Sequence, residues 1–568
     1  MAARSVPRET FSNNLQPQGG TVKSIRWLVA VLSVVALVAA ACGDDEEPAA
    51  PATGAADVAE AQQAAAAAQA AEEEALAAAS AAEERLAAAE AAAAAAGEEM
   101  QAEAQAELEA ARAEAAAAQE AAAAAAEEAA MATEQAAAAA EEAAMATEQA
   151  AMAEAALAEA AMIATDHGVD VENRVIRVGV NTDLSGAFAP LTTKITDGHL
   201  AYWQWINDNG GIQGWTIEPV VIDNAYNVPT HLENYEVMAG DGPQSVVMFS
   251  TSTGSPHTAS TAELLIEDNL AAIPLSWYSG WADPEIGRNV FEVQTNYCIE
   301  AMNGATYMAE TYGPNVAIAS FPGDYGEDGA EGIKVAAEAL GLNIAYDGQA
   351  QVVPGGDLTP VIAGIAESGA DWVWLTTNPT TTAQLIGGAA QAGFSGQWSG
   401  NSPSWNPALL GTGIAELADA TYTHSSYMVL WGVGEAEGMQ EMISVMQEYR
   451  PDAPFDDVYA ISFIEGYVAT QILDAAISSG DLTRAGVLAA ANSITADLKG
   501  LAPDQSWSGN PDHNVVRGTY LYDVDLSLYT PGATVSTPDG NNGFSLIKGP
   551  YVSETAANWQ YEPCFKAS

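Results

Sequence analysis

Residues 175–186, Val-Ile-Arg-Val-Gly-Val-Asn-Thr-Asp-Leu-Ser-Gly, combine a short apolar run with a polar turn. The apolar run predicts a buried β-strand, and the Asp183–Gly186 segment predicts the turn that ends it. Residues 197–209 then carry apolar side chains at helical spacing, and Gly210-Gly211 is typical of a helix C-terminus. The stretch therefore predicts a strand–helix unit that leads into a second strand.

The same alternation of strand and helix continues along the chain. Further strands are expected at 217–223, 245–249, 316–320, 344–346 and 372–376, and helices at 231–238, 299–312, 327–340, 358–368 and 380–392. Alternation at this pitch is typical of doubly wound α/β sheets. Two such units in series predict two lobes, with ligand-binding loops at the carboxyl ends of the strands.

A segment of unusual composition precedes the α/β region. After a linker at 43–56, residues 57–163 consist mainly of Ala, Glu and Gln and contain no proline. Because Ala and Glu favour helix, a long Ala/Glu-rich helical stalk is expected. Its role would be to hold the following domain away from the start of the chain.

Two arrangements of this stalk are consistent with the sequence. Residues 127–137 recur as 141–151, two heptads later, which favours an alanine-type coiled coil with Met131 and Met145 in its seam. Large seam residues are few, however, so a solitary helix of about 150 Å is the other interpretation. Gly97 marks a weak joint in either case.

The first 42 residues have the features of an export signal. Lys23 and Arg26 precede an apolar run at 27–41, which is too short for a typical membrane-spanning helix. The Ala-Ala-Ala-Cys sequence ending at Cys42 resembles a bacterial lipoprotein lipobox. The resemblance implies lipidation of Cys42 and an extracytoplasmic location on the outer face of the cell membrane. The alternative is a secreted protein with a chance cysteine, and residues 1–21 are interpreted as a gene-model extension.

The net charge of the chain limits the classes of partner that it is expected to bind. The formal net charge is −59, of which residues 43–163 contribute −25 and residues 164–568 contribute −37. Nucleic-acid binding requires a basic surface, so a nucleic-acid partner is not expected. A negative surface also slightly favours neutral or zwitterionic ligands over anions.

Motifs for catalysis are missing from the sequence. We find no GxSxG elbow, no HExxH pair, no P-loop and no CxxC. The chain is therefore expected not to be an enzyme, and to carry neither a cofactor nor a metal ion.

Five stretches in a fixed order carry a resemblance to a known family. They are Val178–Gly186, Trp205–Gly214 (Trp-Ile-Asn-Asp-Asn-Gly-Gly-Ile-Gln-Gly), Asp324–Gly329 (Asp-Tyr-Gly-Glu-Asp-Gly), Ala370–Leu375 and Gln391–Phe394. In this order they resemble the type I periplasmic binding proteins, and most closely the branched-chain amino acid and amide receptors of ABC importers. The resemblance runs from about residue 175 to 480, and more loosely to the C-terminus.

The resemblance implies two α/β lobes that are joined by three hinge strands and close around a solute. Lobe 1 would comprise 175–295 plus 426–540, and lobe 2 would comprise 296–425 plus 541–568. The implied partners are a small-molecule solute and the permease subunits of an ABC importer. A ligand sensor that signals to a membrane partner and a structural envelope protein are the alternatives.

The resemblance also implies a set of ligand-binding residues. Thr251 and Ser252, expected in a loop after the third strand, would offer hydroxyl and amide groups to a carboxylate; alternatively they cap the next helix. The other implied contacts are Phe188, Leu275, Ser276, Trp277, Tyr325, Asn378 and Ser402. For the aromatic residues, an ordinary place in the core is the alternative.

Two positions depart from the pattern of amino-acid receptors. Ser402 stands where these receptors usually carry an acid that pairs with the ligand ammonium, and Asn378 stands where an aromatic residue is expected. An amide, a carboxylic acid or another neutral solute is therefore as consistent with the sequence as a branched-chain amino acid.

The implied fold also indicates where two of the cysteines lie. Cys298 and Cys564 both fall in the implied second lobe, outside the membrane, where oxidation is permitted. A disulfide between them would tie down the C-terminal tail. Two free buried thiols are the alternative.

Overall fold

The computed structural model describes residues 53–98, 100–160, 163–509, 514–538 and 540–566. The expected signal sequence, with Cys42, lies outside the described residues. The chain divides into two compact units, Met1–Ala151 and Met152–Ser568, each of which is described by itself.

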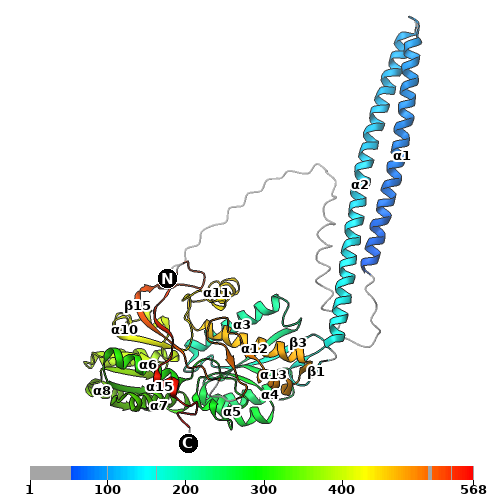
Figure 1. Cartoon of the computed structure of the whole chain (residues 1–568). Coiled ribbons are helices and arrows are strands. Elements are labelled where there is room, and N and C mark those ends of the chain that lie inside the picture. The colour runs from blue at the N-terminus through cyan, green and yellow to red at the C-terminus, as the bar shows by residue number, and fades with distance from the viewer. Residues whose placement is uncertain (1–52, 99, 161–162, 510–513, 539, 567–568) are drawn as a thin grey trace, which may run out of the picture. The chain divides into compact units, whose positions relative to one another are not determined.

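The first unit contains two long helices that run antiparallel. Helices α1 (Thr53–Ala95) and α2 (Gln101–Ala160) lie side by side (Figure 1). Arg85 forms an ion pair with Glu114 at 2.9 Å, and Gln119 donates to Glu83 at 2.7 Å. As the residue number rises along α1, the residue number of its contact partner on α2 falls, so the two helices form an antiparallel hairpin.

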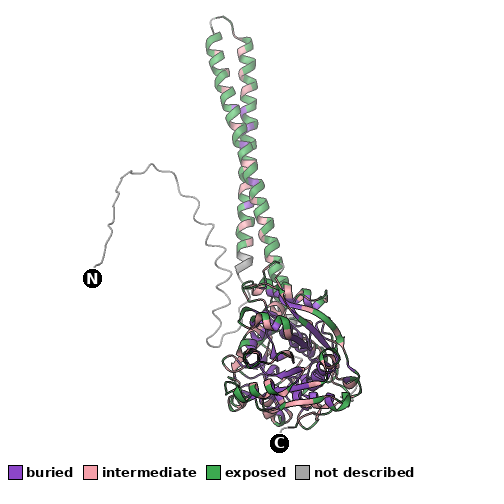
Figure 2. Cartoon of the chain, turned by 90° about the vertical axis from the view of Figure 1, so that its left-hand side faces the viewer, coloured by how far each residue is buried: buried purple, intermediate pink, exposed green. Residues whose placement is uncertain are grey.

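Alanine forms the seam of this hairpin. The buried residues are Ala65, Ala79 and Ala82 of α1 and Ala115, Ala122 and Ala129 of α2, and those of α2 recur every seven residues. Figure 2 shows buried and intermediate positions along helices that are mostly exposed. Because alanine is small, the two helix backbones can approach closely. The prediction of Met131 and Met145 as seam residues is wrong, since their side chains are 53% and 54% exposed.

The interpretation of this segment as a single long helix is wrong, because α1 and α2 form a hairpin. The chain leaves the helical conformation between Ala95 and Gln101, a break that includes the weak joint Gly97, and then reverses. An antiparallel pair brings its two outer ends together. Its length therefore adds nothing to the distance between residue 53 and residue 151, unlike a continuous stalk.

A charge placed in the seam is expected to separate the two helices. In Ala122→Asp the carboxylate would be buried at the contact, whereas in the control Ala123→Asp it would face solvent. Spin labels at positions 83 and 119 would report the separation in the full chain. We expect a broadened distance distribution for Ala122→Asp only, and equal distributions in both variants would contradict the seam.

Two large sheets form the described part of the second unit, beside two sheets of two strands each, and the first large sheet is mainly parallel. Its strands are β2 (Val169–Asp170), β3 (Val175–Thr182), β4 (Thr216–Asp223), β5 (Met248–Thr253) and β6 (Ala272–Leu275). β3 lies between β4 and β5 and pairs with both in parallel, while β6 follows β5 and β2 pairs antiparallel with β3. This sheet is the expected first doubly wound unit.

The second sheet has seven strands in the order β16-β15-β11-β10-β9-β7-β8. Its strands are β7 (Asn315–Ser320), β8 (Asn343–Gly348), β9 (Trp372–Thr376), β10 (Gln397–Gly400), β11 (Tyr422–Ser426), β15 (Thr519–Tyr529) and β16 (Asn542–Tyr551). The first five pair in parallel, whereas β15 and β16 join as an antiparallel edge. The range 426–540, expected in lobe 1, thus contributes β15 to the sheet of the other lobe.

Helices connect the strands of both sheets. They are α3 (Ala189–Asp208), α4 (Val228–Ala239), α5 (Ser255–Glu267), α6 (Tyr297–Tyr312), α7 (Gly323–Leu340), α8 (Thr359–Ser368), α9 (Pro379–Gln391), α10 (Ala415–Thr421), α11 (Glu437–Tyr449), α12 (Tyr459–Ser479), α13 (Arg484–Ala491) and α15 (Glu554–Asn558). Short pieces complete the fold: the 3₁₀ helices Ser279–Ala282, Ser402–Ser404 and Pro407–Gly411, and the strands β1 (Ala164–Thr165), β12 (Asp481–Leu482), β13 (Thr495–Ala496) and β14 (Gln505–Ser506).

Helix α12 is apolar because it lies inside the protein. It is long and apolar enough to cross a membrane, but 78% of its most apolar window is buried. It packs against α3 of the first lobe. Its composition is therefore that of a core helix.

The chain passes between the two lobes three times. Residues 276–296 lead from β6 to α6, residues 427–436 lead from β11 to α11, and residues 492–518 lead from α13 to β15. We call these the first, second and third crossings. Three crossings make both lobes discontinuous, as the resemblance implies.

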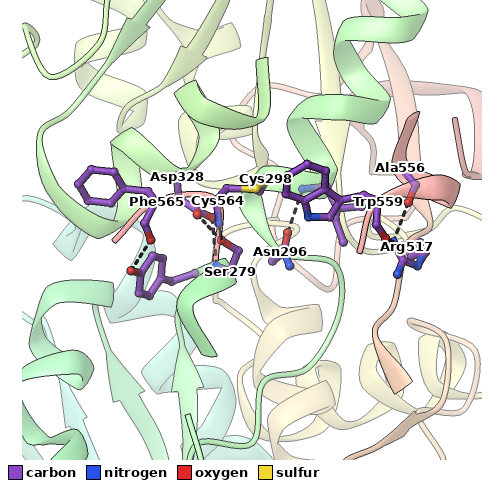
Figure 3. The surroundings of a disulfide bond; sticks show 11 residues. Ser279, Asn296, Cys298, Asp328, Arg517, Ala556, Trp559, Cys564 and Phe565 are labelled. Atoms are coloured by element: carbon purple, nitrogen blue, oxygen red, sulfur yellow. Dashed lines mark hydrogen bonds between the residues drawn. A yellow bond between two sulfur atoms is a disulfide. The ribbon is translucent and has the colours of Figure 1, made fainter. Parts of the chain in front are cut away.

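A disulfide fixes the C-terminal tail. Cys298, at the start of α6, is bonded to Cys564, with 6.3 Å between their Cα atoms (Figure 3). Arg517 also donates to the carbonyl oxygens of Ala556 and Trp559, each at 2.7 Å. The tail is thereby held against the second lobe and the third crossing.

A buried carboxyl group beside this disulfide predicts a pH-dependent stability. Burial raises the pKa of Asp328 from its ordinary value of 3.8 to about 7, although hydrogen bonds from Ser279 oppose the shift. The folded protein therefore holds a proton that the unfolded chain releases between these two values. Relative to Asp328→Asn, the wild-type free energy of unfolding should fall by up to roughly 4 kcal/mol as the pH rises through this window.

Urea unfolding at several pH values would measure this difference in stability. The difference should be smallest below pH 3.8 and constant above about pH 7. A difference that does not change with pH would show that Asp328 has an ordinary pKa.

Candidate functional site

A cavity of about 60 Å³ lies between the carboxyl ends of the two sheets. The first lobe contributes residues that follow β3, β4, β5 and β6, while the second lobe contributes residues that follow β10 and residues of α7. The second crossing and the start of α12 complete the lining. This is the position where α/β sheets bind ligands, because the loops of several strands converge there.

Aromatic side chains from both lobes form much of the wall. Trp277 of the first crossing stacks on Tyr427 of the second, with ring centroids 4.1 Å apart. Phe188 of the first lobe meets Tyr325 of the second edge to face at 5.6 Å. Tyr297 in turn packs on Tyr325 at 4.9 Å. The lobes are thus in contact across the cavity, which leaves room for a small solute.

The turn between β5 and α5 brings backbone to the cavity. Gly254 lies in this turn with φ of 101°, and a Cβ atom there would come within 2.3 Å of Nδ1 of His257. Only glycine fits both the conformation and the space. The turn therefore places Thr253, Gly254 and Ser255 in the lining.

Five of the nine residues expected at the site line the cavity. They are Phe188, Leu275, Trp277, Tyr325 and Ser402. These residues come from both lobes and from the first crossing, and the fold brings them together over more than 200 positions of sequence.

Thr251 and Ser252 lie elsewhere because β5 extends further than expected. The strand includes residues 250–253, so these two residues are in the strand and not in a loop after it. Thr251 donates to the buried carboxylate of Glu465 at 2.7 Å, and Ser252 bonds to Thr258 at 2.8 Å. Their hydroxyl groups therefore serve hydrogen bonds inside the first lobe.

Ser276 and Asn378 border the cavity region but are engaged with other groups. Ser276 donates to Oγ of Ser255 at 2.7 Å. Asn378 caps α9 and donates to the carbonyl oxygen of Ala187 in the first lobe at 3.0 Å. Asn378 thus joins the two lobes, and neither residue is part of the lining.

An acid lies directly behind Ser402. Both the backbone N–H and the hydroxyl of Ser402 donate to Oε1 of Glu300, at 3.0 and 2.9 Å. Burial raises the pKa of Glu300 well above its usual range, against these two hydrogen bonds. A buried acid of α6 therefore lies behind Ser402, the position at which amino-acid receptors usually carry an acid, and Glu300 itself does not line the cavity.

Three polar atoms of the lining have no hydrogen-bond partner among the described residues. They are Oδ2 of Asp457, Nδ1 of His424 and Nε1 of Trp405. Burial lowers the pKa of His424 to about 3, so its ring is neutral. Unpartnered buried polar atoms are costly, so a ligand that pairs with them would be stabilised.

Asp457 supplies the only carboxyl group among the described lining residues. Its Oδ1 accepts from the backbone N–H of Trp431 at 2.8 Å and from the amide of Asn542, which leaves Oδ2 without a partner among the described residues. Burial, followed by the charge of Asp456, raises its pKa well above the usual range. Asp456 is neutralised separately by Lys194.

Little in the sequence indicates Asp457 as a site residue. Asp457 lies just before α12, in a region where we expected no site residue. The adjacent acids Asp456 and Asp457, placed before an apolar helix, are the one available signal. The partner that leaves Oδ2 free, Asn542, is 85 positions away.

A two-lobed α/β protein with three crossings and a cavity at the strand ends is a ligand-binding protein of the periplasmic-binding class. The sequence agrees, because a family model described as "Periplasmic binding protein" matches residues 175–530. The chain belongs to this family, whose members are binding proteins and not enzymes.

Solved structures show the same fold. A fatty acid ABC transporter substrate-binding protein from Thermomonospora curvata is similar, with TM-score 0.63 and 24% identity over 71% of this chain and 98% of that one. A branched chain amino acid ABC transporter protein from Thermus thermophilus, with bound valine, has TM-score 0.58 and 18% identity over 67% and 97%. Among curated proteins, none matches the sequence significantly.

Proposed function

We propose that this protein is the extracytoplasmic solute receptor of an ABC importer and binds its solute in the cavity between the lobes. Membership of the periplasmic binding protein family supports the receptor role. The titles of the two similar structures, both ABC transporter proteins, support the importer. Hinge closure over the solute would create the surface that a permease recognises.

The polar atoms of the cavity favour a solute that carries both a hydrogen-bond donor and an acceptor. Oδ2 of Asp457 calls for a donor when the carboxyl group is ionised, and the indole N–H of Trp405 requires an acceptor. An amino-acid-like compound or an amide meets both requirements. The small volume of about 60 Å³ disfavours a long acyl chain.

A simple carboxylic acid is the second candidate ligand, and the high pKa of Asp457 is the observation that favours it. In its protonated form Asp457 would donate a hydrogen bond to a ligand carboxylate. A ligand that donates a hydrogen bond requires ionised Asp457, whereas a ligand carboxylate requires protonated Asp457. A single substitution of Asp457 therefore distinguishes the two candidates.

Native mass spectrometry of the purified protein, followed by a thermal-shift panel, tests the proposed function. The panel would contain amino acids, primary amides and short aliphatic and aromatic acids. We expect a bound small molecule, or a rise in melting temperature with one of these classes. A protein that binds no member of the panel and no co-purified solute would overturn the receptor role.

The lipid anchor is a separate part of the proposal. Replacing the lipobox cysteine in Cys42→Ser should move the protein from the membrane fraction to the soluble extracytoplasmic fraction, because a lipid chain is its means of attachment. Fractionation of cells and immunoblotting would measure this shift. An unchanged membrane fraction would contradict lipidation at Cys42.

A further inference from the structure

A second cavity, of about 200 Å³, lies at the hinge and apart from the cavity between the lobes. Its walls come from the first crossing, with Trp281, Glu292 and Gln294, and from the third crossing, with Gln505 and Trp507. Tyr561 of the disulfide-bonded tail closes one side. Within the part of the chain that the structure describes, no residue lines both cavities.

Among the side chains that line this cavity, four polar atoms have no hydrogen-bond partner within the described part of the chain. They are Nε1 of Trp281, Oε1 of Glu292, Nε2 of Gln294 and Oε1 of Gln505. All four side chains are deeply buried, with exposed fractions of 6%, 7%, 1% and 6%. A polar ligand that bonded to these atoms would remove the free-energy cost of leaving them unpartnered.

The neighbours of the two glutamines fix which atom faces the cavity. Oε1 of Gln294 accepts from the indole N–H of Trp277 at 3.0 Å, and an indole nitrogen can only donate, so the NH₂ group of Gln294 is left free. Nε2 of Gln505 donates to the carbonyl oxygens of Ser506 and Asn514, so its own oxygen is left free. Reversing either amide would break these hydrogen bonds.

The free groups therefore consist of two donors and two acceptors. Trp281 and Gln294 offer N–H groups, while Glu292 and Gln505 offer oxygens. A carboxylate ligand would satisfy the donors but face two oxygens, and an ammonium ligand would satisfy the oxygens but face two donors. An uncharged amide group carries a C=O and an N–H₂ and can satisfy both sets.

We propose that the hinge cavity is a second binding site, selective for a small uncharged carboxamide. Val290 and Phe291 provide apolar wall for a short alkyl group. The carboxyl group of Glu292 is held at Oε2 by the hydroxyl of Tyr561 at 2.6 Å, which keeps Oε1 directed to the ligand.

The site is connected to the cavity between the lobes through one side chain. Gln294 binds Trp277, which lines that cavity, with its oxygen and faces the hinge cavity with its nitrogen. The hinge site does not depend on the proposed importer function, because none of the residues that line the first cavity would contact its ligand.

The direct test is a crystal structure of the full extracytoplasmic protein soaked with propionamide, with propionate and propylamine as isosteric charged controls. We expect propionamide in the hinge cavity, hydrogen-bonded to Gln294 and Gln505, and neither control in that position. Ordered water alone in all three crystals would overturn the proposal. Equal binding of all three compounds would overturn the selectivity for an uncharged amide.

A variant measures the same site in solution. Val516→Phe fills the cavity without removing a polar group, and the matched control Val353→Phe adds the same ring at an exposed position. Ligand-observed NMR with propionamide should lose its binding signal only in Val516→Phe. For Trp281→Phe, which removes one donor, affinity should fall roughly five- to tenfold. Binding that is unchanged in folded Val516→Phe would place propionamide elsewhere.

Discussion

Asp457→Asn is expected to abolish recognition of an amino-acid-like solute while the protein remains folded. The substitution replaces the free oxygen Oδ2 by an N–H₂ group of the same size, so the cavity gains a donor where it had an acceptor. Losing the partner of a buried ligand ammonium costs at least about 2 kcal/mol, which corresponds to a loss of affinity of roughly 30-fold or more.

The opposite result identifies the other ligand class. If the solute carries a carboxylate that accepts a hydrogen bond from neutral Asp457, the new amide can also donate one, and the affinity should change little. Isothermal titration calorimetry with the solute found by the panel measures both cases. Asp328→Asn is the matched control, because it removes a buried carboxyl group that does not line the cavity.

The fold itself should tolerate Asp457→Asn. Oδ1 of the new asparagine can still accept from the N–H of Trp431, and the cost of burying a carboxylate is removed. We therefore expect a melting temperature at neutral pH equal to or above that of the wild type. If the variant loses both stability and binding, the result would contradict the assignment of Asp457 to the ligand site.

Removal of the disulfide is expected to give the largest loss of stability. Cys298 and Cys564 are 266 positions apart, so their bond closes a long loop and restricts the unfolded chain strongly. The loop-entropy relation gives roughly 5–6 kcal/mol for such a bond. The double variant Cys298→Ala/Cys564→Ala should unfold at a correspondingly lower urea concentration.

Two measurements separate this effect from lost packing. Wild-type protein treated with a reductant should show the same loss as the double variant, since it keeps both side chains. Each single variant, with its remaining cysteine blocked, should match them. A loss below about 1 kcal/mol would show that Arg517 and the packing of the tail hold it without the disulfide.

Local patterns predicted the α/β elements well and their ends less well. The strand at 372–376 and the strand starting at 175 were placed correctly, because apolar runs between polar turns have few other interpretations. The strand at 245–249 was placed three residues early, since its true end, Ser250–Thr253, is polar. Burial of these polar residues depends on partners such as Glu465, more than 200 positions away.

The shift of that strand explains the main error at the site. Thr251 and Ser252 were interpreted as loop residues and are instead part of β5, while Thr253 and Ser255 line the cavity. Trp277 and Tyr325, which the family resemblance implied as ligand contacts, line the cavity after β6 and near the start of α7. Asp457 was missed, since no local pattern distinguishes it from a solvated acid.

The sequence by itself determined the class of the protein. Strand–helix alternation, the absence of basic clusters and five ordered motifs were sufficient for a two-lobed binding fold and for the Ala/Glu-rich helical segment. Helix propensity and apolar periodicity are local properties, so a single sequence can reveal them.

Only the tertiary structure decided which atoms are left without partners. The hairpin of α1 and α2, the membership of β15 in the second lobe, and the free polar atoms of both cavities all depend on contacts between distant residues. Whether a polar side chain is free or engaged is settled by its neighbours in space. The chemistry of both binding cavities therefore follows from the fold and not from any one segment of the chain.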